Sequence, residues 1–361
     1  MSKTGIYIHV PFCARKCPYC DFYSDKFTKE TALDYTKAVI RDINAFPDRL
    51  TVDTVYFGGG TPSMLHAECL SEILTALRER FELVSPEITL EVNPSTVTEQ
   101  KLTAYHDMGI NRLSFGVQSA IDTELSFLGR LHTFDKAKRA VELAKQVGFD
   151  NISCDLMIGI PYQTEDSLNY SIEALCGLPI THISSYMLKI EEGTPFDSEE
   201  TKKLLPDEET VSDYYLKMVD MLEERGFVQY EISNFSKSGF ESRHNLKYWN
   251  CEEYVGFGPS AHSYYGDKRY SVPDNLSGFI SGEYEHIVTD DTPGQWDERI
   301  MLGLRLKKGI NVSDYPEKRE HLLKKAALFE KAGYMEINGS SISLTPRGFL
   351  LSNSIITELI Y

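Results

Sequence analysis

Residues 7–20 contain the most informative stretch of this sequence, Tyr7-Ile8-His9-Val10-Pro11-Phe12-Cys13-Ala14-Arg15-Lys16-Cys17-Pro18-Tyr19-Cys20. Its three cysteines are spaced C-x3-C-x2-C, and no fourth cysteine lies nearby. Three thiolates at this spacing can hold three corners of a cubic iron–sulfur cluster and leave one iron open, whereas an electron-transfer ferredoxin closes all four irons with thiolates. The alternative is a set of buried or zinc-binding cysteines, although zinc sites usually take four protein ligands.

The composition is that of a globular protein with one large and one smaller domain. The chain has 361 residues, of which 42% are hydrophobic, and no run of 18 apolar residues. The first loop cysteine follows after only twelve residues, so we expect no cleavable signal peptide. The seven cysteines are odd in number and are not spaced like a disulfide framework. We therefore expect reducing conditions and a cytoplasmic location.

The net charge of −17 argues against a nucleic-acid partner and against strong attraction to anionic lipid. The charge is uneven, because the residues from Gly294 onward carry ten Lys and Arg against eight Asp and Glu. That part has a net charge of +2, which leaves −19 for the rest. We interpret this as an acidic protein with a separate tail domain. Peripheral membrane contact and a homodimer stay open.

The first two thirds of the sequence alternates short apolar runs with amphipathic segments. Six β–α units in series predict an α/β fold with a parallel sheet, curled into a partial barrel with helices outside. Active groups then belong at the C-terminal ends of the strands, where the cysteine loop lies. The predicted strands are Gly5–Val10, Thr54–Phe57, Ile88–Val92, Arg112–Val117, Ile152–Ile158 and His182–Leu188. The predicted helices are Lys29–Ala45, His66–Arg80, Thr98–Met108, Phe134–Val147, Glu165–Cys176 and Asp207–Arg225.

Three regions are predicted along the chain: a core over 1–236, an irregular connecting segment over 237–290, and a small helical domain over 291–361. Within the last region, helical patterns cover Trp296–Leu306 and Lys318–Ala332. An Asn338-Gly339 turn then predicts a hairpin, and Pro346 is placed to open a final helix. Helices followed by a hairpin resemble a winged-helix domain. Its small charge and lack of a basic stripe argue against DNA binding.

The cysteine motif resembles the radical S-adenosylmethionine (SAM) superfamily. The run Y-x-H-x-P-F-C, together with the glycine-rich run Gly58-Gly59-Gly60-Thr61-Pro62, is similar to the branch of oxygen-independent coproporphyrinogen oxidases and heme chaperones of the HemW type. The resemblance implies a (βα)6 radical SAM barrel with a C-terminal domain like that of the oxidase. It also implies a [4Fe–4S] cluster on Cys13, Cys17 and Cys20, with SAM on the open iron.

The same resemblance implies a set of SAM contacts at strand ends. Glycines at such a position let the backbone approach a ligand, and a carboxylate can accept from ribose hydroxyls or an ammonium group. Gln118, Arg130 and Asp155, each taken alone, are equally compatible with a structural polar group. The implied SAM-binding residues are Tyr7, Tyr19, Gly59, Gly60, Thr61, Glu91, Gln118, Arg130 and Asp155.

The motif H-N-x-x-Y-W favours the heme chaperones over the oxidases. The resemblance implies heme binding by His244, Tyr248 and Trp249, and a neutral imidazole at His244 can be an axial ligand to heme iron. A polar turn with aromatic packing is the structural alternative. His9, His262 and Cys251 are further candidate ligands.

Two more features separate the branches. The oxidases carry another cysteine two residues after the third cluster cysteine, where this chain has Phe22, and they have a long extension before the motif. We therefore expect a heme chaperone that delivers heme to an unidentified hemoprotein of a respiratory chain. The alternatives are the enzyme that decarboxylates coproporphyrinogen III to protoporphyrinogen IX and a radical SAM enzyme with another substrate.

Overall fold

The computed structural model describes residues 3–361, and its centre is a run of six parallel strands. Each strand pairs with the next in the order of the sequence, so every connection is a β–α–β crossover. The fold class predicted from the sequence is confirmed. The strands are β1 (Thr4–Val10), β4 (Thr51–Gly59), β5 (Glu82–Val92), β6 (Arg112–Gln118), β7 (Asn151–Ile158) and β8 (His182–Met187).

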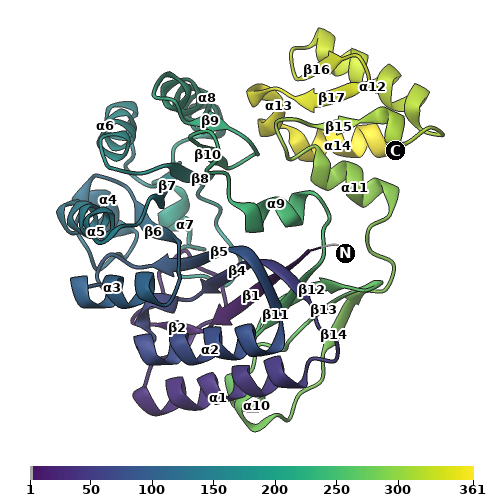
Figure 1. Cartoon of the computed structure of the whole chain (residues 1–361). Helices are drawn as coiled ribbons and strands as arrows, with labels where there is room; N and C mark the ends of the chain where they lie inside the picture. The colour runs from purple at the N-terminus through teal and green to yellow at the C-terminus, as the bar shows by residue number, and fades with distance from the viewer. Residues whose placement is uncertain (1–2) are drawn as a thin grey trace.

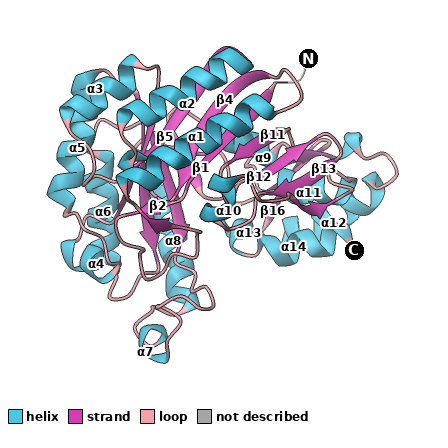
Figure 2. Ribbon diagram, turned by 90° about the horizontal axis from the view of Figure 1, so that it is seen from below, coloured by secondary structure: helices cyan, strands magenta, loops and turns pink. Residues whose placement is uncertain are grey.

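Helices cover the outer face of this curved sheet (Figure 1; Figure 2). Their apolar stripes pack on one continuous core of buried residues. Threonine side chains accept from the N3 amide at the starts of α1 and α6 and form capping boxes there. The helices on the outer face are α1 (Lys29–Ala45), α2 (Ala67–Arg80), α3 (Glu99–Asp107), α4 (Asp122–Phe127), α5 (Phe134–Val147), α6 (Glu165–Cys176) and α8 (Glu208–Glu224).

Side chains alternate across the strands, and the inner positions are polar. On β6, Leu113 and Phe115 are wholly buried among the outer helices, while Arg112 and Ser114 line the interior. On β7, Ser153 and Asp155 line the same interior. The inside of the partial barrel is therefore a polar cavity and not an apolar core.

The sheet extends beyond the six parallel strands on both sides. The pair β10 (Asn234–Ser236) and β9 (Val228–Gln229) continues it antiparallel from β8. On the other side β11 (Tyr254–Phe257) runs parallel to β1, followed by antiparallel β12 (His262–Tyr265), β13 (Lys268–Ser271) and β14 (Ile287–Asp290). The result is a single sheet of twelve strands.

Residues 237–290 differ from the irregular segment that the sequence predicts. They contain four strands of the main sheet and the helices α9 (Arg243–Trp249) and α10 (Leu276–Ser281). The strands are only four residues each, and pairing with distant β1 holds the first of them in place. Such long-range pairing leaves little trace in local sequence pattern.

The C-terminal region forms a separate small layer of helices and strands, coloured yellow-green in Figure 1. The predicted hairpin is present, with Gly339 at a φ of +65° in its turn, and it joins β15 in a three-stranded sheet. An isolated antiparallel β-bridge between the backbones of Glu231 and Leu306 connects this region to the core. Its elements are α11 (Trp296–Gly303), β15 (Ile310–Asn311), α12 (Arg319–Lys331), β16 (Met335–Asn338), β17 (Ser341–Leu344), α13 (Pro346–Leu350) and α14 (Ser352–Ile360).

Within residues 3–361, no helix combines the length and the apolar character that crossing a membrane requires.

Candidate functional site

The cysteine loop lies at the C-terminal end of β1, at the mouth of the polar cavity. A short strand, β2 (Phe12–Cys13), leads into it and pairs with β3 (Asp25–Lys26). All three loop cysteines are half-buried and line one cavity of about 450 Å³. Cys13 Sγ lies 3.7 Å from Thr61 Oγ1, and Arg130 Nη1 donates to Cys17 Sγ at 3.6 Å.

The donor set suits an iron–sulfur cluster. Burial raises the pKa of the Cys13 and Cys20 thiols, so both are protonated at neutral pH unless a metal takes the proton's place. Within residues 3–361, no three His, Cys, Asp or Glu side chains converge closely enough to hold a single metal ion. A cubic cluster does not need such convergence, because each of its thiolates binds a different iron.

The glycine-rich run forms a cradle directly against the cysteine loop. Gly60 N donates to Val10 O at 2.9 Å, and Thr61 N donates to Phe12 O at 2.7 Å. A Cβ on Gly60 would lie 2.7 Å from Phe12 O, so no side chain fits there. Gly59 has a φ of +106°, which favours glycine. Glycine is thus required at these positions by close approach and by backbone conformation.

Two carboxylates, Glu91 on β5 and Asp155 on β7, face the cavity from either side of β6. Tyr56 donates to Glu91 Oε1 at 2.8 Å, and Ser114 donates to Asp155 Oδ1 at 3.4 Å. Burial raises the pKa of Glu91 to about 7 and that of Asp155 to about 6. A cationic ligand in the cavity would favour the ionised form of both groups.

Gln118 and Arg130 also line the cavity. Gln118 has a φ of +76°, a rare conformation for a residue with a side chain, and its amide oxygen accepts from Tyr186 at 2.8 Å. Arg130 donates to Gly116 O at 2.6 Å, which places its guanidinium between β6 and the cysteine loop. Tyr19, on the loop itself, also lines the cavity.

Tyr7 alone among the residues implied to contact SAM does not line this cavity. Its hydroxyl hydrogen-bonds His9 Nδ1 at 3.1 Å, and its ring lies beside the Tyr56 and His244 rings. The structure therefore brings together the three cysteines, Tyr19, the glycine-rich run, both carboxylates, Gln118 and Arg130, and leaves Tyr7 behind the cavity wall.

Comparison with known proteins identifies the family. The radical SAM superfamily domain matches residues 7–175, and the HemN C-terminal domain matches residues 293–351. Heme chaperone HemW of Lactococcus lactis is 32% identical over 99% of this chain and 98% of the relative. Heme chaperone HemW of Bacillus subtilis is 34% identical over 97% of each chain.

This chain belongs to the HemW family of radical SAM proteins.

A solved structure supports the fold of this HemW-family chain. Coproporphyrinogen III oxidase (HemN) from Escherichia coli, a radical SAM enzyme, matches with a TM-score of 0.84 over 99% of this chain and 90% of that one. The two sequences are 20% identical, so the likeness concerns the fold.

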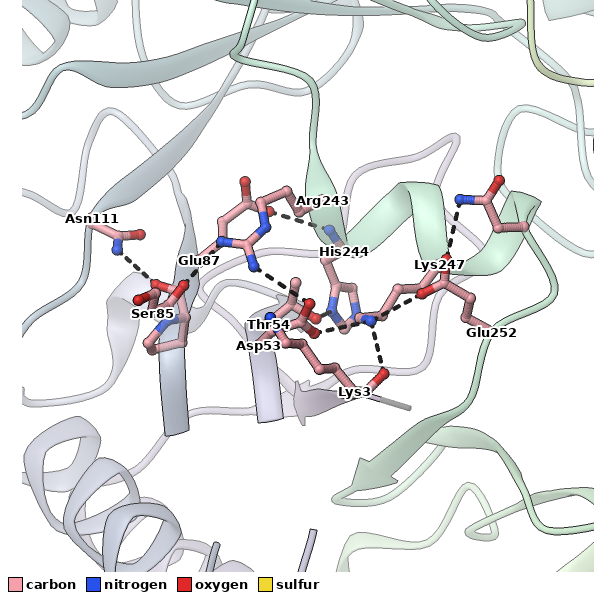
Figure 3. A network of polar contacts seen from close by, with 12 residues as sticks. Lys3, Asp53, Thr54, Ser85, Glu87, Asn111, Arg243, His244, Lys247 and Glu252 are labelled. Atoms are coloured by element: carbon pink, nitrogen blue, oxygen red, sulfur yellow. Dashed lines mark hydrogen bonds and ion pairs between the residues drawn. The ribbon is translucent and has the colours of Figure 1, made fainter. Parts of the chain in front are cut away.

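The H-N-x-x-Y-W motif of this HemW-family chain forms helix α9, which lies beside the N-terminal parts of β4 and β5 (Figure 3). His244 is 1% exposed and its two ring nitrogens are hydrogen-bonded, Nδ1 to Thr54 Oγ1 at 2.9 Å and Nε2 to the Tyr248 hydroxyl at 2.8 Å. Burial lowers the pKa of His244 to about 3, so the imidazole is neutral.

Ion pairs and hydrogen bonds of charged side chains hold α9 against the strands β4 and β5 (Figure 3). Lys247 Nζ is 2.9 Å from Asp53 Oδ1 and donates to Lys3 O at 3.0 Å, and its side chain is 4% exposed. Arg243 reaches Ser85 O at 3.0 Å. The predicted heme ligand thus lies in a closed position, at the opposite end of the barrel from the cysteines.

The other predicted heme residues pack around the same helix. The Tyr248 ring lies edge-on to Tyr254 at 4.6 Å between centroids. Trp249 is half-buried beside the wholly buried carboxylate of Glu231. Of the further candidate ligands, Cys251 is buried and His262 is exposed.

Several cavity residues carry no signal in a single short motif. They share an inward-facing position on a strand, which the alternation of the strands could have indicated once the sheet was known. These residues are Tyr56, Arg112, His182, Tyr186 and Asn234.

Proposed function

We propose that this protein is a heme chaperone that carries a [4Fe–4S] cluster and SAM, binds heme in the cytoplasm, and delivers it to a hemoprotein of a respiratory chain. The main support is the convergence on one cavity of the three loop cysteines and of the residues implied to bind SAM, apart from Tyr7. The names of the curated relatives support the heme chaperone part of the proposal.

In this proposal, Cys13, Cys17 and Cys20 hold the cluster at the cavity mouth, and the glycine cradle with Glu91 and Asp155 orients SAM. When bound, the cluster and SAM supply one-electron chemistry. Arg130 hydrogen-bonds Cys17 and so balances the negative charge that thiolates bring to a buried site. The raised pKa of each carboxylate means that a cationic ligand and proton release are coupled at neutral pH.

Heme would bind through helix α9 and its histidine. Because both ring nitrogens of His244 are engaged in the closed position, heme ligation requires α9 to leave the strands. A chaperone must release its cargo, and a ligand site that opens and closes provides a route for release.

The first experiment tests the cluster and SAM. The protein is reconstituted without oxygen, its iron and sulfide are measured, and SAM binding is followed by calorimetry. We expect about four irons per chain and SAM binding that depends on the cluster. A protein that never assembles a cluster, or whose cluster has every iron held by cysteine, would overturn the proposal.

The second experiment tests heme. Heme is titrated into the wild type and into His244→Ala, and transfer to a heme-free recipient is followed by its absorption spectrum. We expect the variant to lose affinity and to change the Soret band. Unchanged affinity and spectrum would remove His244 as the ligand. Formation of protoporphyrinogen IX from coproporphyrinogen III, SAM and reductant would replace the chaperone with the oxidase.

A further inference from the structure

The floor of the cavity is polar and lies far from the cysteine loop. Arg112 begins β6 and Gln118 ends it, so six residue steps of about 3.3 Å separate their Cα atoms by roughly 20 Å. Both residues line the same cavity. Around Arg112, the floor is lined by the polar residues Ser153, His182, Ser184, Asn234 and Asn245.

The Nε of the Arg112 guanidinium has no partner among residues 3–361. The residue is 2% exposed, and it takes part in none of the ion pairs found within residues 3–361. Asn234 Oδ1 on the same floor is also without a partner in the described chain. An arginine stays charged in a protein, and a buried charge without a partner is costly.

The carboxylates higher in the cavity have other partners, since Glu91 accepts from Tyr56 and Asp155 from Ser114, and neither forms an ion pair with Arg112 within residues 3–361. Burial raises the pKa of Glu91 and of Asp155, and the opposing effect of Arg112 on each is smaller. A carboxylate in direct contact with a guanidinium would instead have a lowered pKa. The positive charge on the floor is therefore left for something else to pair with.

We propose that the cavity floor is a second binding position, in which Arg112 receives the carboxylate of a ligand other than SAM. This deepens the proposed function and rests on it in one respect, since it takes the methionine end of SAM to lie at the cysteine loop. That end is too distant for its carboxylate to reach the floor.

The chemistry of the floor favours a singly charged carboxylate. The planar guanidinium can donate two parallel hydrogen bonds to two carboxylate oxygens, and the amides of Asn234 and Asn245 and the hydroxyl of Ser184 can donate to the rest. A more highly charged anion would be repelled by Glu91 and Asp155 whenever these are ionised.

Trifluoroacetate is a suitable probe, with trifluoroacetamide as its neutral counterpart, and fluorine NMR measures binding of each to the SAM-loaded protein. We expect the wild type to bind the carboxylate at least tenfold more tightly than the amide. Arg112→Gln should remove this preference. Arg112→Lys should weaken it, because a lysine ammonium lacks the planar pair of donors that a guanidinium offers to two carboxylate oxygens. Arg78→Gln is the matched control, because it makes the same change at an exposed arginine outside the cavity, whose guanidinium donates to Met108 O. It should behave like the wild type.

The outcomes separate this proposal from the proposed function. No preference for trifluoroacetate in the wild type, or an equal preference in Arg112→Gln, would overturn it. Loss of SAM affinity in Arg112→Gln without any effect on trifluoroacetate would assign Arg112 to SAM and overturn it as well. If SAM never binds, the proposed function fails, while the carboxylate preference is still measured on the protein without SAM. If Arg112→Gln does not fold, Arg112→Lys and the wild-type comparison decide.

Discussion

If His244 binds heme, weakening the contacts that hold α9 closed should strengthen heme binding. The substitution Asp53→Asn tests this, because Asp53 lies under α9 and pairs with Lys247 at 2.9 Å and with Arg243 at 3.4 Å (Figure 3). Asparagine keeps the size of the side chain and removes its charge. His244 itself is unchanged in this variant.

The magnitude follows from the burial of the pair. Breaking a buried ion pair costs about 3–5 kcal/mol, but Lys247 keeps the Lys3 carbonyl at 3.0 Å and Glu252 at 3.1 Å. We therefore take about 2 kcal/mol for the loss of stability of the closed position. At 1.4 kcal/mol for each factor of ten, this raises the population of the open position about 30-fold. Apparent heme affinity rises by the same factor while the open position stays in the minority.

The assay is heme titration followed at the Soret band, with Asp135→Asn as the control. Asp135 pairs with Arg139 on the surface, with both side chains more than half exposed, so this variant should leave heme affinity unchanged. Equal heme affinity in Asp53→Asn and the wild type would refute the reasoning, because heme would then bind without release of α9.

Three further predictions concern the cluster, the cradle and the domain junction. Cys17→Ser should reduce iron after anaerobic reconstitution from about four per chain to below one, while Cys176→Ser should keep the wild-type content; retention of the cluster in Cys17→Ser would contradict the ligand set. Gly60→Ala should weaken SAM binding at least tenfold in calorimetry, because the new Cβ would lie 2.7 Å from Phe12 O. A loss of affinity of less than twofold would show that the backbone around Gly60 moves to accommodate the Cβ. Burial raises the pKa of Glu231 from its ordinary 4.5 to about 7, so the stability it contributes is present below pH 4.5 and lost as the pH rises through 7. At pH 8, the free energy of unfolding of Glu231→Gln, measured by urea denaturation, should therefore exceed that of the wild type by up to about 3 kcal/mol. A variant that is less stable than the wild type at pH 8 would be inconsistent with this.

The repeating part of the fold could be predicted from local pattern. Helix α1 spans Lys29–Ala45 as expected, because its amphipathic period and its Thr28 cap are both local signals. The six parallel strands lie where apolar runs occur, although β4 and β5 begin earlier than predicted. Those extra residues are held by pairing with neighbouring strands, which local sequence does not encode.

The candidate site was predictable only in part. The cysteine loop and the strand-end residues belong to short motifs, and the spacing within each motif can be read directly from the sequence. The burial of His244 cannot, because it depends on Thr54 of β4 and on Gly5 and Tyr7 of β1, which enclose the ring of a helix distant in sequence. A motif identifies a chemical group, and whether that group is open to a ligand is decided by tertiary packing.

The two ends of the barrel are physically connected, and this bears on how SAM and heme would affect each other. The His244 ring stacks on Tyr56 at 5.2 Å between centroids, and Tyr56 donates to Glu91. If α9 leaves to expose His244, Tyr56 loses its stacking partner and the hydrogen bond that it donates is no longer held in place. Glu91 in turn is less well positioned for SAM. Because coupling between two binding sites is reciprocal, SAM held by Glu91 favours the closed position of α9 and opposes heme ligation at His244. The chain would then release heme more readily when SAM is bound than when it is absent, which is the direction that a chaperone needs for delivery.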